Sequence, residues 1–375
     1  MKKSTIITIL AFALGVVILS LGFILLTDNN ISRKLFATTT TSPEEQPAPE
    51  PMDFLKEDVR KYVTLGQYKG LDVEVEKTES TKEEIDKEIA GWITKEVELA
   101  RLSDGAVGQK ALFSFDYVGY LANEDGSRGK EFEGGASINQ LAYIDGDTLV
   151  TISENGMGSF IPGFAQGILG HTVGETFDID VTFPEDYQAS QLAGKKTIFT
   201  ITLKSYDYYA EQIKKSVDNE INNTNRDLVW AEIVKNATLL QIPEQQLNYV
   251  YNYFVEDIEY YMSYYASMGL EVTFDQMLSY YGFSSADELK EYAKEVVFSD
   301  LVVYAVIQAE NLEITDEEYA ALIAELAEST GETEADIIEY YSQYYGGEEG
   351  IKEIMLLDKA NNFVLNENNP IVKEK

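Results

Sequence analysis

The residues that could do chemistry lie in one largely apolar stretch, SFIPGFAQGILGH at residues 159–171. Its last residue, His171, is the only histidine of the chain, which contains no cysteine. A Cys/His site is therefore impossible, and a metal site built from several histidines is excluded. A lone histidine after glycine is typical of a turn, so we interpret His171 as structural and expect neither a metal ion nor a cofactor.

The elements that must position this stretch are a short helix and a set of strands. Pro162 near its start and Gly170 near its end predict a helical turn between them, with Pro162 at the first helical position. Apolar and polar residues alternate on both sides, which predicts strands at 112–120, 175–183 and 196–206. The sequence therefore predicts a small sheet wrapped on a short helix, and the alternation assigns four residues to its core: Phe115, Phe177, Phe183 and Ile201.

Five blocks of this region, in order along the chain, resemble the FKBP-type peptidyl-prolyl isomerase domain of trigger factor: FDYVGY, EFEGG, IPGFAQGILGH, VTFPEDY and FTITL. The lead-in at 68–89 and the later helices are also similar to trigger factor, so the resemblance covers residues 60–368. It implies an α+β fold. An FKBP-like antiparallel sheet wrapped on a short helix is expected at 110–207, and an all-α trigger factor C-terminal-like chaperone domain at 208–368.

The resemblance implies a cleft that catalyses rotation about the bond before a proline. This rotation meets a barrier of about 18–20 kcal/mol because the planar amide must lose its resonance. A dry apolar cleft favours the twisted amide, which is less polarised than the planar form, and a few fixed donors can hold its geometry. Carried over by motif position, Leu149 and Phe160 bind substrate, and the catalytic residues are Tyr117, Phe132, Glu133, Ile161, Phe164, Tyr187 and Phe199.

Single positions take further roles from the resemblance. Phe164 is expected to form the floor of the cleft, and the Ile161 backbone N–H to hold the carbonyl that precedes the substrate proline. Glu133 is expected at the rim, and Tyr187 to point its hydroxyl inward. The sequence departs from the family at Leu149, where many relatives have an aromatic ring, and the segment after it is longer than usual. Both departures are expected to weaken activity.

The charge and composition of the chain exclude some partners. There are 29 Lys and Arg against 65 Asp and Glu, which gives a net charge of -36. Such a surface repels nucleic acid and anionic lipid and disfavours docking to a ribosome. A chain of 375 residues exceeds what one core usually holds, so two or more domains are expected. The absence of cysteine fits an exported protein.

Residues 1–27 are interpreted as a cytoplasmic tip and a transmembrane anchor. Two lysines precede an uncharged apolar run at 4–26, which is long enough to cross a hydrocarbon core of roughly 30 Å. A cleaved signal peptide is the alternative, but its apolar region is usually shorter, and the nearest candidate cleavage site, Phe36-Ala37, lies well past the run. We expect a single-pass anchor in the cell membrane with the body on the extracytoplasmic side, although basic residues also follow the run.

The segments after the anchor lead into the sheet. Residues 28–59 include a Thr/Pro/Glu tract with little to bury, which predicts an extended linker. Residues 60–109 form a lead-in segment, with a strand at 68–77 and a helix at 81–99 that a capping box at Thr81 begins. We interpret this segment as a brace for the domain that follows. The anchor and linker stand where trigger factor has its ribosome-binding domain.

The part of the chain after residue 207 predicts long helices. Thr315 and Thr333 are expected to begin two of them. The helical pattern covers seven ranges: 211–237, 242–269, 274–281, 286–312, 316–328, 333–345 and 351–364.

Tyrosines are unusually dense in the predicted helix at 242–269, where they fall around more than one face. Exposed tyrosines can hold unfolded segments through adaptable contacts. We therefore expect Tyr253, Tyr260 and Tyr264 to bind client chains. The alternative is ordinary helix packing with scattered surface tyrosines.

These features lead to one functional hypothesis and its alternatives. The chain is expected to be a membrane-anchored peptidyl-prolyl cis-trans isomerase and chaperone, whose partners are unfolded or nascent exported polypeptides with Xaa-Pro bonds. The main alternative is an extracytoplasmic holdase chaperone with an inactive isomerase domain. A third hypothesis is an anchored chaperone that faces the cytoplasm.

Overall fold

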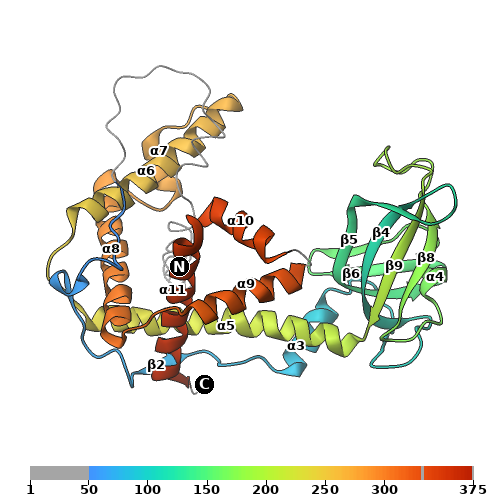
Figure 1. The fold of residues 1–375 in the computed structure, drawn as a ribbon, viewed down its shortest axis with the longest axis horizontal. Helices are drawn as coiled ribbons and strands as arrows, with labels where there is room; N and C mark the ends of the chain where they lie inside the picture. Colours follow the sequence, from blue (N-terminus) through green and yellow to red (C-terminus); the bar gives the residue numbers. More distant parts are fainter. Residues whose placement is uncertain (1–49, 331–332, 374–375) are drawn as a thin grey trace. The chain divides into compact units, whose positions relative to one another are not determined.

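The computed structural model describes residues 50–330 and 333–373, which form two compact units (Figure 1). The sheet unit comprises Glu79–Ile221, and the helical unit comprises the described residues on either side of it. The expected anchor at 4–26 lies outside the described residues, as does most of the expected linker. Within the described ranges, no helix is both long enough and apolar enough to span a membrane.

The sheet unit is built on one seven-stranded sheet with the order β7-β6-β5-β4-β9-β8, in which β3 also pairs with the start of β4. Neighbouring strands are antiparallel except for the short β3–β4 pair. The three predicted strands are confirmed as β4, β8 and β9. The strand bounds are β3 Ala100–Arg101, β4 Ala111–Ala122, β5 Arg128–Asp145, β6 Thr148–Ser153, β7 Gly156–Ser159, β8 Thr176–Thr182 and β9 Lys196–Lys204.

Both faces of this sheet are covered near the start of β4. Side chains alternate between the faces, so Phe113 joins the cluster under helix α4 (Phe164–Ile168), and Leu112 joins a second cluster. The second cluster packs against helix α3 (Lys82–Gly91) and the first turns of α5 (Tyr206–Asn236). Burial on both faces explains why β4 opens with a continuous buried run.

Helix α3 is shorter than the predicted helix at 81–99. Its start is as predicted, because the Thr81 hydroxyl accepts a bond from the Glu84 N–H while the Glu84 carboxylate accepts one from the Thr81 N–H. The helix ends at Gly91, where glycine and the β-branched residues that follow are weak helix formers. The residues beyond it still pack against the sheet, as do Ile85 and Ile89. The interpretation of the lead-in segment as a brace is confirmed for this helix and the residues after it, whereas residues 60–78 belong to the helical unit.

Helix α4 begins later than predicted. Pro162 does not occupy its first turn, because Gly163 is the N-cap residue and Phe164 the first helical residue. Gly163 has φ 106, a backbone conformation that favours glycine, and a Cβ there would lie 3.3 Å from Val181 Cγ1. The predicted end of the helix before Gly170 is confirmed.

The helical unit contains the remaining helices and two small sheets. The helix starts predicted at Thr315 and Thr333 are confirmed, and each threonine forms a capping box. β1 (Val63–Thr64) pairs antiparallel with β10 (Thr238–Leu239), and β2 (Asp72–Val75) pairs parallel with β11 (Asn369–Val372). The helix bounds are η1 Val59–Lys61, α6 Glu244–Ser267, α7 Phe274–Tyr280, α8 Ala286–Glu310, α9 Asp316–Thr330, α10 Glu334–Tyr345 and α11 Gly347–Glu367.

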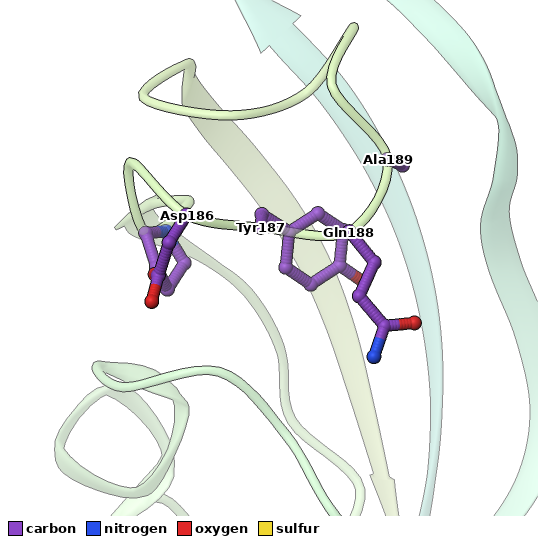
Figure 2. Close-up of a pocket in the computed structure, with 5 residues that line it drawn as sticks. Asp186, Tyr187, Gln188 and Ala189 are labelled. Carbon is purple, nitrogen blue, oxygen red and sulfur yellow. The ribbon is translucent and has the colours of Figure 1, made fainter.

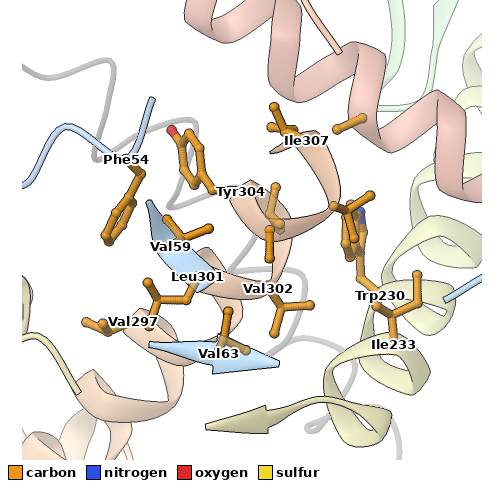
Figure 3. Close-up of a cluster of buried hydrophobic side chains, with 14 of the residues drawn as sticks. Phe54, Val59, Val63, Trp230, Ile233, Val297, Leu301, Val302, Tyr304 and Ile307 are labelled. Carbon is orange, nitrogen blue, oxygen red and sulfur yellow. The ribbon is translucent and has the colours of Figure 1, made fainter. Parts of the chain in front are cut away.

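The core of the helical unit surrounds α8, whose residues from Asp300 to Ile307 are all buried (Figure 3). The ring of Phe54 lies 5.2 Å from the ring of Tyr304, and Val59 is fully buried in the same cluster. The expected linker at 28–59 was therefore wrong at its end. Apolar side chains after the Thr/Pro/Glu tract anchor the chain in the core, and the expected lead-in segment is divided between the units after Thr78.

Asp300 is an acidic residue inside this apolar core, with 3% of its surface exposed. Its Oδ1 atom has no hydrogen-bond partner among the described residues, and burial raises the pKa of its carboxyl well above the ordinary value. The folded state therefore holds this proton more tightly than the unfolded state. The protonated Asp300 carboxyl therefore contributes fully to stability at pH values below its pKa in the unfolded state. This contribution is lost as the pH rises through its pKa in the folded state.

We expect Asp300→Asn to stabilise the helical unit at pH 8, because the amide cannot ionise in the core. The gain in the free energy of unfolding should exceed the roughly 0.5 kcal/mol typical of surface substitutions and should shrink toward pH 4. Urea denaturation at both pH values measures it. Asp358→Asn, at an exposed carboxylate of α11, is the matched control. Equal effects of the two variants at pH 8 would contradict the assignment.

Candidate functional site

The aromatic residues predicted to form the site come together on the face of the sheet that α4 covers. The Phe164 ring of α4 lies 4.5 Å from the Phe160 ring and 4.7 Å from the Phe199 ring of β9. Tyr117 of β4 packs edge-on against Phe160 at 5.1 Å. These contacts join residues that are up to 82 positions apart in the chain, from Tyr117 to Phe199.

A second set of contacts extends this group to the loop after β8. The Phe132 ring of β5 lies 5.8 Å from Phe199 and 5.9 Å from Phe183, and the Phe183 ring lies 4.6 Å from Tyr187. Phe183 was predicted to be core, and it links the two sets. We call the whole group the aromatic cluster: Tyr117, Phe132, Phe160, Phe164, Phe183, Tyr187 and Phe199.

Burial divides the cluster into a floor and a rim. Phe164 is 1% exposed and Phe199 is 4% exposed, so they form a buried floor. Tyr117, Phe132, Phe160 and Ile161 are half-buried, whereas Glu133 is exposed and Tyr187 is 36% exposed. The structure thus brings the predicted catalytic residues to one part of the sheet unit.

Leu149, which was predicted to bind substrate, packs in the buried layer with Phe164 and Phe199. Its side chain is 1% exposed because the alternation of β6 turns it into the core beneath the cluster. Its carbonyl accepts the Phe160 N–H at 3.0 Å. Phe164 of the floor is equally buried, so the contact of Leu149 with substrate stays a prediction. The segment after it, expected to be unusually long, folds into the β6–β7 hairpin.

An open hollow of about 460 Å³ lies at one end of the cluster (Figure 2). Tyr187 belongs to both the hollow and the cluster, since its ring packs on Phe183. A bond from the Tyr187 N–H to the Pro184 carbonyl at 3.1 Å shapes this loop. The hollow is lined by Pro184, Asp186, Tyr187, Gln188 and Ala189.

The hydrogen-bond donors of the site that have no acceptor among the described residues include the Tyr117 hydroxyl, the Tyr187 hydroxyl and the Ile161 backbone N–H. Burial, and then the neighbouring Tyr187, raise the pKa of the Tyr117 hydroxyl above its ordinary value. The phenol therefore keeps its proton at neutral pH and remains a donor. The site thus combines an apolar floor with residues that carry unused donors.

The polar side chain of His171 takes part in local contacts. The His171 ring stacks on the Phe177 ring at 3.5 Å, and its Nδ1 atom lies 2.7 Å from the Glu175 carboxylate. The interpretation of His171 as a structural residue fits these contacts. In the described parts of the chain, no group of three or more acidic or histidine side chains is placed to hold a metal ion.

Gly119 is a site residue that the sequence reasoning missed. A Cβ at this position would lie 2.6 Å from Phe199 Cε1 and 2.8 Å from Phe132 Cζ. The two rings can therefore meet only over a residue without a side chain. A glycine inside a strand often marks such a close approach, and this signal was present in the FDYVGY block.

The tyrosines of α6 divide into packed and exposed residues. Tyr253 is half-buried beside Phe254, whereas Tyr260 is 53% exposed and Tyr264 is 52% exposed. Ordinary helix packing therefore does not bury all the large side chains of this region. Five more are exposed on α6, on α7 or next to them: Tyr261, Met268, Leu270, Tyr280 and Tyr281.

Two known families match adjoining parts of the chain. The family described as FKBP-type peptidyl-prolyl cis-trans isomerase matches residues 106–204, which contain β4 to β9 and α4. The family described as bacterial trigger factor protein (TF) C-terminus matches residues 204–366. The fold and the aromatic cluster thus belong to an FKBP-type domain, and a helical chaperone domain follows it.

Whole-chain relatives agree with these matches. The trigger factor of Macrococcus caseolyticus (strain JCSC5402) is 30% identical over 338 residues, which are 81% of this chain and 72% of that protein. The trigger factor of Halothermothrix orenii is 29% identical over 339 residues, or 83% of this chain and 74% of that protein. The chain belongs to the trigger factor family.

A solved structure described as "Promiscuous Substrate Recognition in Folding and Assembly Activities of the Trigger Factor Chaperone" covers 81% of this chain and 72% of its own. Its sequence identity is 17% and its TM-score 0.32. This superposition is too weak to inform the arrangement of the units.

We expect Gly119→Ala to disrupt the cluster, because the new methyl group displaces the Phe132 and Phe199 rings. Overpacking of this kind typically costs about 1–3 kcal/mol. Urea denaturation gives the loss of stability, and near-ultraviolet circular dichroism reports the aromatic packing. Gly91→Ala is the matched control, since nothing lies within 4 Å of its added Cβ. A Gly119→Ala protein as stable as the control, with an unchanged aromatic spectrum, would refute the packing argument.

Proposed function

We propose that the aromatic cluster catalyses cis–trans isomerisation of Xaa-Pro bonds. The observation that supports this proposal is the combination of two unused donors, the Tyr117 hydroxyl and the Ile161 N–H, with the buried floor of Phe164 and Phe199. The floor receives the proline ring and keeps water away from the amide. The Ile161 N–H binds the carbonyl before the proline, and the Tyr117 hydroxyl is a second donor for the twisted peptide.

The proposed chemistry needs no covalent step, metal ion or proton transfer. An apolar site lowers the barrier because the twisted amide is less polarised than the planar amide and loses less solvation there. Donors fixed in advance add to this effect without reorganisation. Glu133 and Tyr187 lie at the rim, where they contact the flanking residues of a client chain. Leu149 supports the floor from beneath.

We expect Tyr117→Phe to lower kcat/KM for a proline-containing peptide about two- to tenfold, the range for one lost hydrogen bond. Its ring packing stays, so the fold is preserved. Protease-coupled peptide assays measure the rate. Tyr120→Phe is the matched control, because Tyr120 lies on the same strand and packs on Arg128 instead. Phe164→Ala is a poorer probe, because removing this buried ring typically lowers the free energy of unfolding by about 3–5 kcal/mol. Equal rates for Tyr117→Phe and the wild type would sink the proposed role of the hydroxyl.

The helical unit is proposed to hold unfolded client chains near this site. The exposed tyrosines of α6 and α7 support the proposal, since they combine large apolar surfaces with hydroxyl groups. Holding a client beside the cluster raises the local concentration of its prolines, so a modest catalytic site becomes effective. The same exposed tyrosines would serve a holdase with an inactive isomerase domain, which is the alternative function.

Membrane anchoring and a role with exported proteins are further parts of the proposal. They rest on the apolar run at 4–26 and on the absence of cysteine. In this arrangement the body faces the extracytoplasmic side, and exported polypeptides with Xaa-Pro bonds are the clients. The net charge of -36 disfavours the ribosome and nucleic acid as partners.

We expect the double variant Tyr260→Ser/Tyr264→Ser to weaken the suppression of client aggregation, because it removes two exposed aromatic surfaces. The chain concentration needed for half-suppression should rise at least about threefold. Light scattering of a denatured client on dilution measures it. Tyr208→Ser, at an exposed tyrosine of the sheet unit, is the control. Full suppression by the double variant would remove these tyrosines from the proposed client surface.

A further inference from the structure

The edge strand β7 has an unpaired outer side that leads directly to the aromatic cluster. It is the last strand of the sheet and pairs only with β6 on its inner side, among the described residues. The bond from the Phe160 N–H to the Leu149 carbonyl at 3.0 Å fixes which backbone groups point inward. Because these directions alternate along an antiparallel pair, the groups of Gly158 also point to β6. Those of Met157 and Ser159 point outward.

The outward row continues to the substrate-binding donor. Ile161 lies two residues after Ser159, just beyond the end of β7, and we infer that its N–H continues in the same outward direction. The outward groups in order are the Met157 carbonyl, the Ser159 N–H and carbonyl, and the Ile161 N–H. None of them has a hydrogen-bond partner in the described ranges. The Ile161 N–H is thus the last position of an unused β-ladder.

The two edges of the sheet differ in how they are protected. β8 carries Asp178 and Asp180, and Arg128 binds Asp178 with a donor–acceptor distance of 2.6 Å. Charges of this kind keep other chains from pairing with an edge. β7 has the sequence GMGS, with neither a charge nor a proline. The edge beside the aromatic cluster is therefore the one open to another strand.

We propose that β7 binds the client's main chain as an added parallel strand, using the residues that precede the proline. This inference rests on the proposed isomerase function and specifies its substrate as an extended segment. The carbonyl of residue X, just before the proline, accepts the Ile161 N–H, and the N–H of X donates to the Ser159 carbonyl. Two residues earlier, the client's carbonyl accepts the Ser159 N–H, and its N–H donates to the Met157 carbonyl.

The direction of the added strand follows from the position of the floor. A parallel client runs past Ile161 toward Phe164, so the proline reaches the cluster. An antiparallel client would turn back along β7 and carry the following residues away from it. The parallel strand also holds the side before the X–Pro bond while the proline side is free to rotate. Fixing one side in this way places the reacting bond without blocking its rotation.

The test uses the full chain and a peptide with five residues before the proline. Three versions are compared: all amides, an ester in place of the N–H two residues before X, and an ester in place of the N–H one residue before X. The first ester removes a donor to the Met157 carbonyl, whereas the second removes an N–H that points away. We expect kcat/KM to fall about two- to tenfold for the first ester only.

A protein variant provides the reciprocal test. Ser159→Pro removes an outward N–H that does not bond within the sheet, a position where an edge strand tolerates proline. Ser159→Ala keeps the N–H and is the matched control. The five-residue peptide should be isomerised faster than a peptide that begins at X, and this advantage should disappear in Ser159→Pro but not in Ser159→Ala.

The outcomes separate the inference from the function on which it rests. Equal effects of both esters, or a length advantage that Ser159→Pro retains, would overturn strand addition while isomerase activity stands. Catalysis of no peptide by the wild-type chain would overturn both. A loss confined to the ester two residues before X, together with a lost length advantage, supports the added strand.

Discussion

The packing of the Phe164 ring between Phe160 and Phe199 is the contact on which the site depends. It ties α4 to β9 and to the end of β7, so the floor and the Ile161 N–H are placed by the same residues. Gly119 makes this packing possible by leaving room for the Phe132 and Phe199 rings. The proposed catalytic surface is therefore an extension of the core, and its geometry is set by the forces that fold the sheet unit.

The two units solve different physical problems. The sheet unit fixes aromatic rings and donors within a rigid sheet, as a site that distinguishes a twisted from a planar amide requires. The helical unit keeps large tyrosine surfaces exposed, and its acidic residues keep such a surface soluble. Its fold is secured elsewhere, by α8 and by the Phe54 and Val59 side chains that pack near it. The exposed tyrosines of α6 and α7 and the buried core around α8 thus lie on different helices.

Much of this organisation could be predicted from the sequence. The alternation predicted β4, β8 and β9, and threonines followed by acidic residues marked helix starts, because both signals are local. The aromatic group depended on the family resemblance, since no spacing rule brings Tyr117, Phe132 and Phe199 together. The early end of α3 at Gly91 follows from local helix propensity, whereas the errors at Gly163 and Phe54 share another cause. Tertiary packing decided where α4 begins and how far the core extends into an apparent linker.

The central claim is that this chain is a catalyst of prolyl isomerisation. The most direct test is the refolding rate of an unfolded protein client whose folding is limited by one proline, measured with and without the full chain. The rate without a catalyst is set by isomerisation over tens to hundreds of seconds. We predict that substoichiometric amounts of the chain accelerate this phase. An unchanged proline-limited rate, with aggregation of the client still suppressed, would contradict the claim and leave a holdase.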